Sequence, residues 1–283
     1  PSRLHPTVWM GWWLAYSRTQ RRTRTPYASF IEGALSLYGG VALSALTAYA
    51  VSSTIGRLRM PYRNVVTGLA LKPALSLRPL LAAATSVQVA LERHHLIEAR
   101  QLLGWHLVSR DTTDLSPAEV AGAAIESVAE NLSDSVVAPL LAFRLGGLPL
   151  AYAYRMINTA DAMLGYRTRE LEWFGKMAAR SDDVANFIPA RCSAVLIACA
   201  AACGGGSTRR AIALARLDAS RTTSPNAGWP MAAMAGALSV RLTKRDLYSL
   251  NTPARLPRAA DIGRACRIVA GAATLAAIVV DLS

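Results

Sequence analysis

The feature that most restricts the fold of this chain is an apolar run at residues 33–56, which contains no charged side chain. A helix needs about 20 apolar residues to cross the hydrocarbon core of a bilayer, and this run is long enough to do so. The composition agrees, because charged residues make up only 17% of the chain, whereas soluble domains usually carry about 25%. The sequence therefore predicts a membrane protein.

Four further stretches are weaker candidates for membrane spans. Length alone cannot separate a short span from a buried core helix. Sustained Val/Ile/Thr alternation, the sequence sign of strands, is absent. We therefore predict an all-α, polytopic integral membrane protein with several helices in the lipid bilayer. The four candidates are residues 135–154, interrupted only by Arg144, residues 192–208, residues 225–240, and the short stretch 268–280.

The net charge of +13 admits two interpretations. A strongly basic protein often binds nucleic acid. Here the arginines form short groups beside apolar stretches, such as Arg57, Arg59 and Arg63, which is typical of anchoring next to a membrane. The basic–aromatic pattern of an RNA-binding module does not occur. We predict that the protein has no nucleic-acid partner.

Trp9, Trp12 and Trp13 lie at helical spacing near the start of the chain. Tryptophan side chains are enriched at membrane surfaces, where they anchor a helix. The same spacing also suits ordinary core packing. The sequence leaves both interpretations open.

Most of the polar residues that suggest chemistry lie within residues 104–191. One helix start there is well defined, because Ser116 suits the N-cap, Pro117 the first helical position and Glu119 the reciprocal position of a capping box. We expect this helix to run toward Pro139. We also expect one membrane-embedded domain over residues 1–283, with N-terminal membrane helices at 1–103, a motif-bearing catalytic core at 104–191 and C-terminal helices at 192–283.

Three carboxylates recur at four-residue spacing on this predicted helix, namely Glu126, Glu130 and Asp134. Ser127 and Asn131 form a second pair on an adjoining face. Like charges at this spacing repel, and oxygen ligands of this kind suit Mg²⁺, which often bridges to substrate phosphates. A solvated acidic face is the alternative. The apolar flanks favour a functional site, since ionisable residues within membrane segments are usually functional.

Asp182, Asp183 and Asn186 follow Lys176 and Arg180 at helical spacing. These residues can form surface ion pairs. The carboxylates can also hold Mg²⁺ while the arginine binds phosphate oxygens. The segment by itself leaves both interpretations open.

Two other polar features have equally plain alternatives. Asn158 and Asp161 can belong to a site or can cap a helix. Arg110 can clamp a phosphate or carboxylate, whereas Asp111 and Thr112 beside it can simply cap a loop. A Walker A loop, a dinucleotide-binding glycine motif and a Gly-x-Ser-x-Gly elbow are all absent from the sequence. If the protein uses ATP, a P-loop does not hold it.

Taken in order along the chain, the motifs resemble those of one family, the CobD/CbiB adenosylcobinamide-phosphate synthases of cobalamin biosynthesis. The resemblance covers most of the chain, and the order of the motifs makes it specific. The matching motifs are His5-Pro6, Ser109-Arg110-Asp111-Thr112, Ile125-Glu126-Ser127, Ala129-Glu130-Asn131, Val136-Val137-Ala138-Pro139, Gly146-Gly147-Leu148-Pro149, Asn158-Thr159, Asp161-Ala162-Met163, Phe174-Gly175, Ala178-Ala179-Arg180, Asp182-Asp183, Pro189-Ala190-Arg191 and Ser224-Pro225-Asn226-Ala227-Gly228-Trp229-Pro230.

The chain departs from the family pattern at a few positions. Glycine is common in the family where Ser109 and Ser135 stand, and histidine is common just before the Ser-Pro-Asn motif, where this chain has Thr222 and Thr223. These departures bear on fine substrate specificity more than on activity.

The resemblance implies a multi-pass enzyme of the cell membrane. The implied reaction joins a carboxylate of adenosylcobyric acid, a corrinoid, to the amine of (R)-1-aminopropan-2-ol phosphate, and it gives adenosylcobinamide phosphate. ATP and Mg²⁺ are implied as co-substrate and cofactor. Association with other membrane enzymes of cobamide assembly is a further expectation.

This chemistry gives each candidate residue an expected role. The catalytic candidates are Glu126, Glu130, Asp111 and Asp161. The metal candidates are Glu130, Asp134, Asp182 and Asp183. The candidates for binding substrate or phosphate are Arg110, Thr112, Ser127, Asn131, Asn158, Lys176, Arg180, Asn186, Arg191 and Asn226.

Two other functions compete with this hypothesis. A Mg²⁺-dependent membrane prenyltransferase would use paired acidic motifs, which Asp161 and Asp182-Asp183 loosely resemble. Such motifs usually hold more aspartates, however. A non-catalytic membrane sensor related to the family would be expected to lose the motif carboxylates, and this chain retains them.

Overall fold

The computed structural model describes residues 5–20, 25–166 and 168–282. The chain forms two compact units, and each unit is assembled from two separated segments. Unit 1 comprises Pro1–Leu75 and Ala138–Ala185, and unit 2 comprises Ser76–Val137 and Asn186–Ser283. The single domain expected over residues 1–283 stays a prediction.

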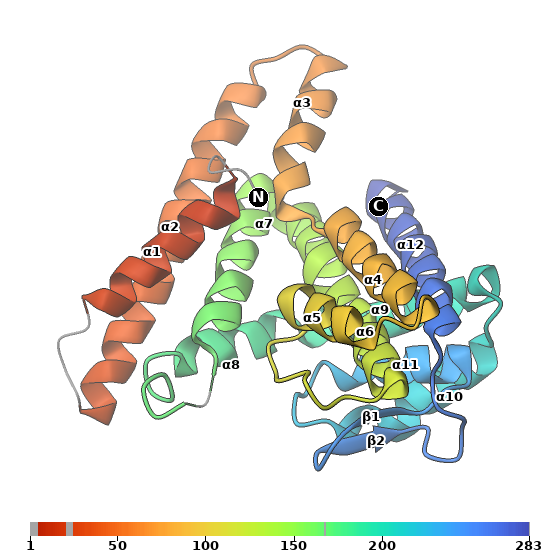
Figure 1. Ribbon diagram of the computed structural model, residues 1–283. Helices are drawn as coiled ribbons and strands as arrows, with labels where there is room; N and C mark the ends of the chain where they lie inside the picture. The colour runs from red at the N-terminus through yellow and green to blue at the C-terminus, as the bar shows by residue number, and fades with distance from the viewer. Residues whose placement is uncertain (1–4, 21–24, 167, 283) are drawn as a thin grey trace. The chain divides into compact units, whose positions relative to one another are not determined.

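The described residues are mostly helical, with two short strands (Figure 1). Three helices are long and apolar enough to cross a membrane, or up to five spans if two bent helix pairs count as one span each. These three are Pro26–Ile55, Pro117–Leu164 and Ala259–Val280. The predicted all-α, polytopic membrane fold is therefore confirmed, and the run at residues 33–56 lies in the first of these helices.

Unit 1 consists of helices from the start and the middle of the chain. Its elements are α1 (Pro6–Thr19), α2 (Pro26–Ile55), α3 (Tyr62–Leu71), the 3₁₀ turn η1 (Lys72–Ala74), α7 (Ala138–Leu164) and α8 (Lys176–Ala185).

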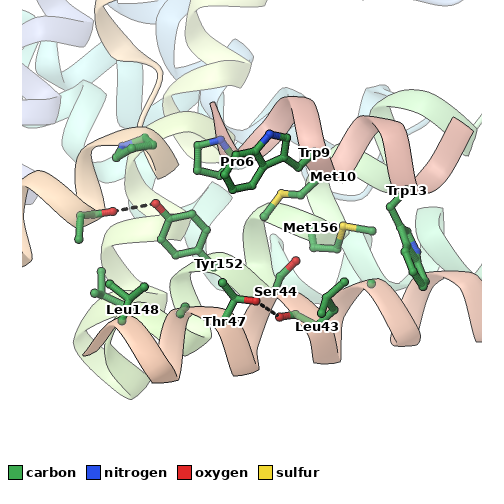
Figure 2. Close-up of a pocket in the computed structure, with 15 residues that line it drawn as sticks. Pro6, Trp9, Met10, Trp13, Leu43, Ser44, Thr47, Leu148, Tyr152 and Met156 are labelled. Atoms are coloured by element: carbon green, nitrogen blue, oxygen red, sulfur yellow. Dashed lines mark hydrogen bonds between the residues drawn. The ribbon is translucent and has the colours of Figure 1, made fainter. Parts of the chain in front are cut away.

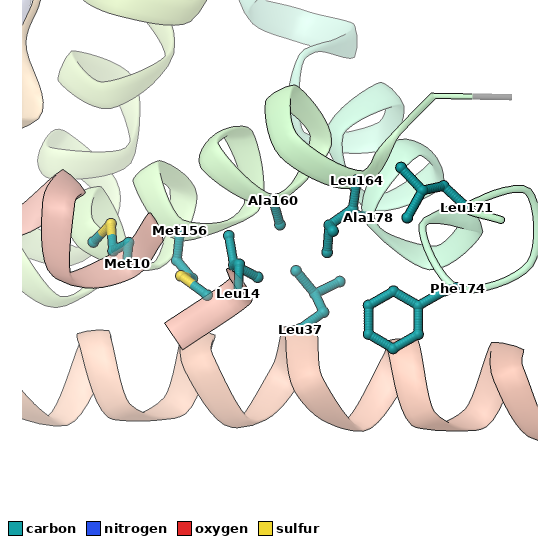
Figure 3. Close-up of a cluster of buried hydrophobic side chains, with 9 residues drawn as sticks. All are labelled: Met10, Leu14, Leu37, Met156, Ala160, Leu164, Leu171, Phe174 and Ala178. Carbon is teal, nitrogen blue, oxygen red and sulfur yellow. The ribbon is translucent and has the colours of Figure 1, made fainter. Parts of the chain in front are cut away.

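A cluster of buried apolar side chains joins α1, α2, α7 and α8 in unit 1 (Figure 3). Leu14 and Leu37 are almost completely buried there, together with Phe174 from the loop before α8. Gly33 lets α2 approach this loop closely, because a Cβ at this position would lie 1.9 Å from the backbone oxygen of Phe174. Any larger residue would push the loop away from the helix. The cluster consists of Met10, Leu14, Leu37, Met156, Ala160, Leu164, Leu171, Phe174 and Ala178.

Two consecutive glycines interrupt α7. Gly146 (φ −148°, ψ 23°) and Gly147 (φ 62°, ψ −156°) leave the helical conformation, and the helix resumes beyond them. The dihedral angles of Gly147 fall in a region that is essentially restricted to glycine. This residue therefore encodes the break in the helix.

An apolar cavity of about 500 Å³ lies in unit 1 between α1, α2 and α7 (Figure 2). Trp9 and Trp13 line it, and both remain substantially exposed, as does Trp12. Trp13 Nε1 donates a hydrogen bond of 2.9 Å to the backbone oxygen of Ser36. The three tryptophans are therefore not ordinary core residues, and a role in anchoring at the membrane surface stays a prediction.

Unit 2 contains the remaining helices and the two short strands. Its elements are α4 (Leu77–Glu92), α5 (Leu96–His106), α6 (Pro117–Leu132), the π-helical turn η2 (Ser133–Val137), α9 (Phe187–Ala200), η3 (Ala201–Gly204), α10 (Thr208–Asp218), η4 (Ala219–Arg221), α11 (Gly228–Leu238), β1 (Leu242–Lys244), β2 (Tyr248–Leu250) and α12 (Ala259–Leu282).

Helix α6 begins as the sequence predicts. Ser116 is its N-cap and Pro117 its first residue, and both halves of the capping box with Glu119 are formed. The α-helical part ends at Leu132, where a π-helical turn carries the chain to Val137. A π-turn contains more residues than an α-turn, so the four-residue spacing used in the prediction does not extend past Leu132.

The candidate span at residues 225–240 is mostly α11, which has only 11 residues. At about 1.5 Å per residue, such a helix is shorter than the hydrocarbon core of a bilayer. Its residues from Pro230 to Leu238 are buried inside unit 2. The prediction of a membrane span here is wrong, because uniform hydrophobicity also describes a helix surrounded by protein.

A small antiparallel hairpin, β1–β2, adds two strands that the sequence did not reveal. Each strand has three residues, which is too short for an alternating pattern to be recognised. The turn between the strands places Asp246 at φ 59°. In Figure 1 the hairpin lies at the lower edge of unit 2.

Candidate functional site

A polar cavity of about 260 Å³ lies within unit 2 and collects several of the predicted site residues. Its walls come from the loop after α5, from one face of α6, from α11 and from the hairpin. We call it the polar cavity. It is lined by Leu107, Val108, Ser109, Arg110, Ala123, Glu126, Ser127, Glu130, Met231, Lys244 and Tyr248.

Glu126 is the more deeply buried of the two carboxylates that line the polar cavity. The whole residue is only 5% exposed. Its Oε2 lies 3.9 Å from Nη2 of Arg110, at the outer limit of an ion pair, and its Oε1 is buried without a hydrogen-bond partner. A buried carboxylate oxygen without a donor is energetically unfavourable. A ligand that donates a hydrogen bond would relieve this.

Glu130 lies one turn beyond Glu126 and also lines the polar cavity, as the four-residue spacing predicts. Asp134, the third carboxylate of the predicted face, lies in the π-turn η2 and is not among the described residues that line the cavity. That all three carboxylates share one face stays a prediction for Asp134, because the α-helical spacing ends at Leu132.

Ser127 and Asn131 are paired on α6, as their spacing predicts. Asn131 Nδ2 donates to the backbone oxygen of Ser127 (2.9 Å) and to its Oγ (3.3 Å). Ser127 Oγ in turn donates to the backbone oxygen of Leu107 (2.8 Å). These bonds hold the loop after α5 against α6. Ser127 also lines the polar cavity, and the substrate-binding role of the pair stays a prediction.

The loop that carries Arg110 is fixed by its next two residues. Thr112 Oγ1 donates to the backbone oxygen of Arg100 (2.9 Å). Asp111 accepts hydrogen bonds from the backbone nitrogen (2.9 Å) and Oγ1 (2.8 Å) of Thr113. These bonds lower the pKa of the exposed Asp111 carboxyl below its ordinary value. Both side chains hold the loop, and Arg110 reaches the polar cavity from it.

Lys244 and Tyr248 enter the polar cavity from the hairpin, and sequence reasoning missed both. They are register partners across the two strands. Burial, together with the nearby carboxylates of Glu126 and Glu130, raises the pKa of the Tyr248 hydroxyl above its ordinary value. The hydroxyl therefore stays protonated at neutral pH, and it donates a weak bond to Met231 Sδ (3.8 Å).

A second cluster in unit 2 joins Arg191 to the Ser-Pro-Asn turn 35 residues further along the chain. Arg191 Nη1 donates to Asn226 Oδ1 (3.2 Å) and to the backbone oxygen of Phe187 (2.6 Å). Its guanidinium lies over the rings of Phe187 (3.5 Å) and Trp229 (4.9 Å). The structure thus brings together Arg191 and Asn226, both predicted to bind substrate, and adds Trp229.

Unit 1 holds another set of predicted site residues, between α7 and α8. Asn158 Nδ2 donates to Asp182 Oδ1 (3.4 Å), and Arg155 Nη1 donates to Asn158 Oδ1 (3.2 Å). Thr159 Oγ1 donates to the backbone oxygen of Arg155 (2.7 Å). We call Arg155, Asn158 and Asp182 the α7–α8 cluster. Sequence reasoning missed Arg155, which lies one helical turn before Asn158.

The other predicted residues of this region have separate surroundings. Lys176 lies 3.7 Å from Glu172 Oε1 and 4.0 Å from the centre of the Trp173 ring. Arg180 is exposed on α8. Asp161 lies against Gly165, since a Cβ on this glycine would be 2.1 Å from Asp161 Oδ1. Of the last two, Asp183 is half-buried on α8, and Asn186 is buried at the start of α9 in unit 2.

The predicted metal ligands are divided between the units, with Glu130 and Asp134 in unit 2 and Asp182 and Asp183 in unit 1. Among the described residues, no three His, Cys, Asp or Glu side chains are grouped so that they could hold a metal ion. Mg²⁺ usually binds only one or two carboxylates and completes its shell with water and substrate phosphates. The polar cavity offers carboxylates of this kind, and the ligand set stays a prediction.

Comparison with known proteins identifies the family. Residues 1–269 match a family model described as CobD/Cbib protein. The chain belongs to the CobD/CbiB family. The resemblance predicted from the order of the motifs is thereby confirmed.

The CobD/CbiB relatives match over most of the chain. The probable cobalamin biosynthesis protein CobD of Methanothermobacter thermautotrophicus is 40% identical over 253 residues, which are 89% of this chain and 82% of the relative. The cobalamin biosynthesis protein CobD of Dehalococcoides mccartyi is 38% identical over 256 residues, or 90% and 82%. That of Klebsiella pneumoniae is 37% identical over 240 residues, or 84% and 75%. No solved structure matches the chain.

Proposed function

We propose that this chain is an amide synthase of cobalamin biosynthesis. It joins a carboxylate of adenosylcobyric acid to the amine of (R)-1-aminopropan-2-ol phosphate, using ATP and Mg²⁺, and forms adenosylcobinamide phosphate. The observation that carries the proposal is the polar cavity, where the buried carboxylate of Glu126 and the cation of Arg110 line one small space. Relatives named for cobalamin biosynthesis support the pathway.

The size and charge of the polar cavity suit the smaller substrate. At about 260 Å³, it lies below the range of about 300–1,000 Å³ that is usual for drug-sized ligands, so it suits a small molecule rather than a corrinoid. An amino-alcohol phosphate carries charges of both signs. Its ammonium would lie beside Glu126 and Glu130, and its phosphate would point toward Arg110.

The reaction needs an activated carboxylate and a deprotonated amine. A carboxylate is a poor acyl donor, so we propose that phosphoryl transfer from ATP first gives an acyl phosphate and ADP. The ammonium gives a proton to Glu126 Oε1, the oxygen that has no hydrogen-bond partner in the structure. The amine nitrogen then forms the C–N bond, and inorganic phosphate leaves. Tyr248 and Arg110 orient the small substrate.

The residues present are compatible with Mg²⁺. When bound, the ion neutralises charge on the transferring phosphoryl group. Glu130 would hold it in the polar cavity together with the phosphates of the substrates. Asp134 is the other proposed ligand in unit 2, and Asp182 and Asp183 are proposed Mg²⁺ ligands within unit 1. The corrinoid would contact Arg191 and Asn226 of unit 2, which form a hydrogen bond with one another.

We also propose that the protein acts in the cell membrane as a multi-pass enzyme. The support is the set of three helices long and apolar enough to cross a bilayer. Association with other membrane enzymes of cobamide assembly is part of the same proposal.

The direct test is to incubate the detergent-purified full chain with adenosylcobyric acid, aminopropanol phosphate, ATP and Mg²⁺. We expect mass spectrometry to detect the amide, and we expect Glu126→Gln to abolish it nearly completely. Glu98→Gln is the matched control, because Glu98 is an exposed carboxylate on α5 of the same unit. A folded wild-type protein that forms no amide under any of these conditions would overturn the proposal.

The metal ligands need a separate measurement. Glu130→Gln and Asp182→Asn each remove a carboxylate and keep the shape of the side chain. If both variants kept full Mg²⁺-dependent activity, the proposed metal site would be abandoned.

A further inference from the structure

We propose that Lys244 of the β1–β2 hairpin forms, with Arg110, an anion-binding half of the polar cavity that takes a phosphate monoester, and that Arg245 positions this half. The inference rests on the proposed function, because it names residues that recognise the phosphorylated amine. None of these hairpin residues belongs to a motif that pointed to the family.

The inner face of the hairpin is fixed by its register. Leu242 pairs with Leu250, and both are completely buried. Side chains two residues apart on a strand share a face, and opposite residues of a pair lie on the same side. The buried leucines therefore turn the next pair, Lys244 and Tyr248, toward the polar cavity. A shift of one residue would move this pair to the other face.

The base of the hairpin is anchored to the body of unit 2. The backbone nitrogen of Asn251 donates to Asp218 Oδ2 (2.7 Å). Asn251 Nδ2 donates to the backbone oxygens of Ala235 (3.3 Å) and Val240 (3.1 Å). Because Asn251 directly follows β2, these bonds fix where the strand ends.

The tip of the hairpin is anchored by Arg245. Its guanidinium forms a bidentate pair with Glu119, with Nη2 2.6 Å from Oε2, and the same Nη2 donates to the backbone oxygen of Asp114 (3.0 Å). Glu119 is also the acidic member of the capping box that starts α6. The contact therefore ties Lys244, the neighbour of Arg245, to the helix that carries Glu126 and Glu130.

The ammonium of Lys244 is not engaged by another side chain in the part of the chain that the structure describes. It forms no ion pair or hydrogen bond among these residues, although it lies within electrostatic reach of Glu126. Arg110 is likewise only at the outer limit of an ion pair, 3.9 Å from that carboxylate. Two cations held near a cavity without close anionic partners are suited to a ligand with at least two negative charges.

Direct binding to the full chain in detergent tests the inference without requiring turnover. The probes are (R)-1-aminopropan-2-ol phosphate and the same amine without phosphate, measured by calorimetry. We expect Lys244→Ala to weaken binding of the phosphorylated amine about tenfold or more, as for loss of a charge-assisted hydrogen bond, and to leave the unphosphorylated amine unaffected. Lys244→Met should weaken binding as much as Lys244→Ala does, because both remove the ammonium, although Met keeps the apolar stem of the side chain.

Arg245→Ala should weaken binding of the phosphorylated amine by a smaller factor, about threefold, since it loosens the hairpin without removing the cation. Arg209→Ala is the matched control, because Arg209 is exposed on α10 of the same unit, and it should bind both amines as the wild type does. The inference is overturned if the Lys244 variants bind the phosphorylated amine as the wild type does, or if they weaken the binding of both amines by the same factor.

Activity separates this inference from the proposed function. A wild-type protein that binds the phosphorylated amine through Lys244 but forms no amide contradicts the proposed function and supports the inference. If the wild-type protein forms the amide while the Lys244 variants keep their preference for the phosphorylated amine, the proposed function is supported and the inference about Lys244 is contradicted.

Discussion

The polar cavity of unit 2 and the α7–α8 cluster of unit 1 contain similar kinds of residues, but the carboxylates of the two regions are satisfied differently. In the α7–α8 cluster, Asn158 links Arg155 to Asp182 through hydrogen bonds within the protein. In the polar cavity, Glu126 Oε1 is buried without a partner beside an open space. The first arrangement stabilises the packing of two helices, and the second is suited to a ligand.

This difference shows why polar motifs of equal weight in the sequence need not have equal roles. A hydrogen bond between side chains contributes roughly 0.5–1.5 kcal/mol to stability, whereas a buried group left unsatisfied is unfavourable by about 1–3 kcal/mol. A buried group without a hydrogen-bond partner is less unfavourable when a bound ligand supplies that partner. Substitutions in the two regions should therefore separate activity from stability.

The largest effect is expected at Glu126. Glu126→Gln keeps the shape of the side chain and removes the proposed proton acceptor, so kcat/KM should fall about 10²–10⁴-fold. The thermal midpoint in detergent should change by less than about 3 °C, because no hydrogen bond to Oε1 is lost. A variant that loses activity only in proportion to its loss of stability would contradict the comparison.

Arg191 should show the next largest effect. Arg191→Lys keeps the charge but loses the planar group that lies over Phe187 and Trp229. We expect kcat/KM for adenosylcobyric acid to fall about tenfold, which corresponds to roughly 1.4 kcal/mol for the cation–π contacts of a half-buried arginine. Arg209→Lys, on the exposed face of α10, is the control. Unchanged kinetics in Arg191→Lys would assign this cluster a purely structural role.

The Mg²⁺ dependence compares the two regions directly. We expect the Mg²⁺ concentration that gives half-maximal activity to rise about tenfold in Glu130→Gln and about threefold in Asp182→Asn, because carboxylate charge contributes most of the attraction for this ion. The smaller effect is expected where the carboxylate already accepts a hydrogen bond from Asn158. If the half-maximal Mg²⁺ concentration rose equally in the two variants, the proposed difference between the polar cavity and the α7–α8 cluster would be contradicted.

The smallest effect on activity is expected at Asn158. Asn158→Ala removes its hydrogen bonds to Arg155 and Asp182, so the free energy of unfolding should fall by about 1–2 kcal/mol. The value of kcat/KM should stay within about threefold of the wild type. A rise of KM beyond this, with unchanged stability, would give Asn158 the substrate-binding role that the sequence predicts.

Local sequence signals predicted the helical elements of the site well. The capping box at Ser116 and Glu119 placed the start of α6, and the four-residue spacing placed Glu126 and Glu130 in the same cavity. Both signals depend on interactions within one helix, which the sequence encodes directly. The π-turn after Leu132, which contains Asp134, carries no such signal.

The tertiary part of the site could not be predicted from the sequence. Lys244 and Tyr248 are more than 100 residues away from Glu126 along the chain and reach it through three-residue strands without a visible pattern. Arg155 lies in an apolar helical run, and its hydrogen bond to Asn158 is what places it in the α7–α8 cluster. The division into units of interleaved segments is likewise a property of long-range packing.

The two glycines that interrupt α7 also bear on how the chain enters a membrane during its synthesis. A straight helix over the 48 residues of Pro117–Leu164 would be about 72 Å long, more than twice the roughly 30 Å of a hydrocarbon core. The break at Gly146 and Gly147 divides this length into two segments that an insertion apparatus would handle separately. We therefore expect a side chain at position 147 to strain the break that separates these two segments.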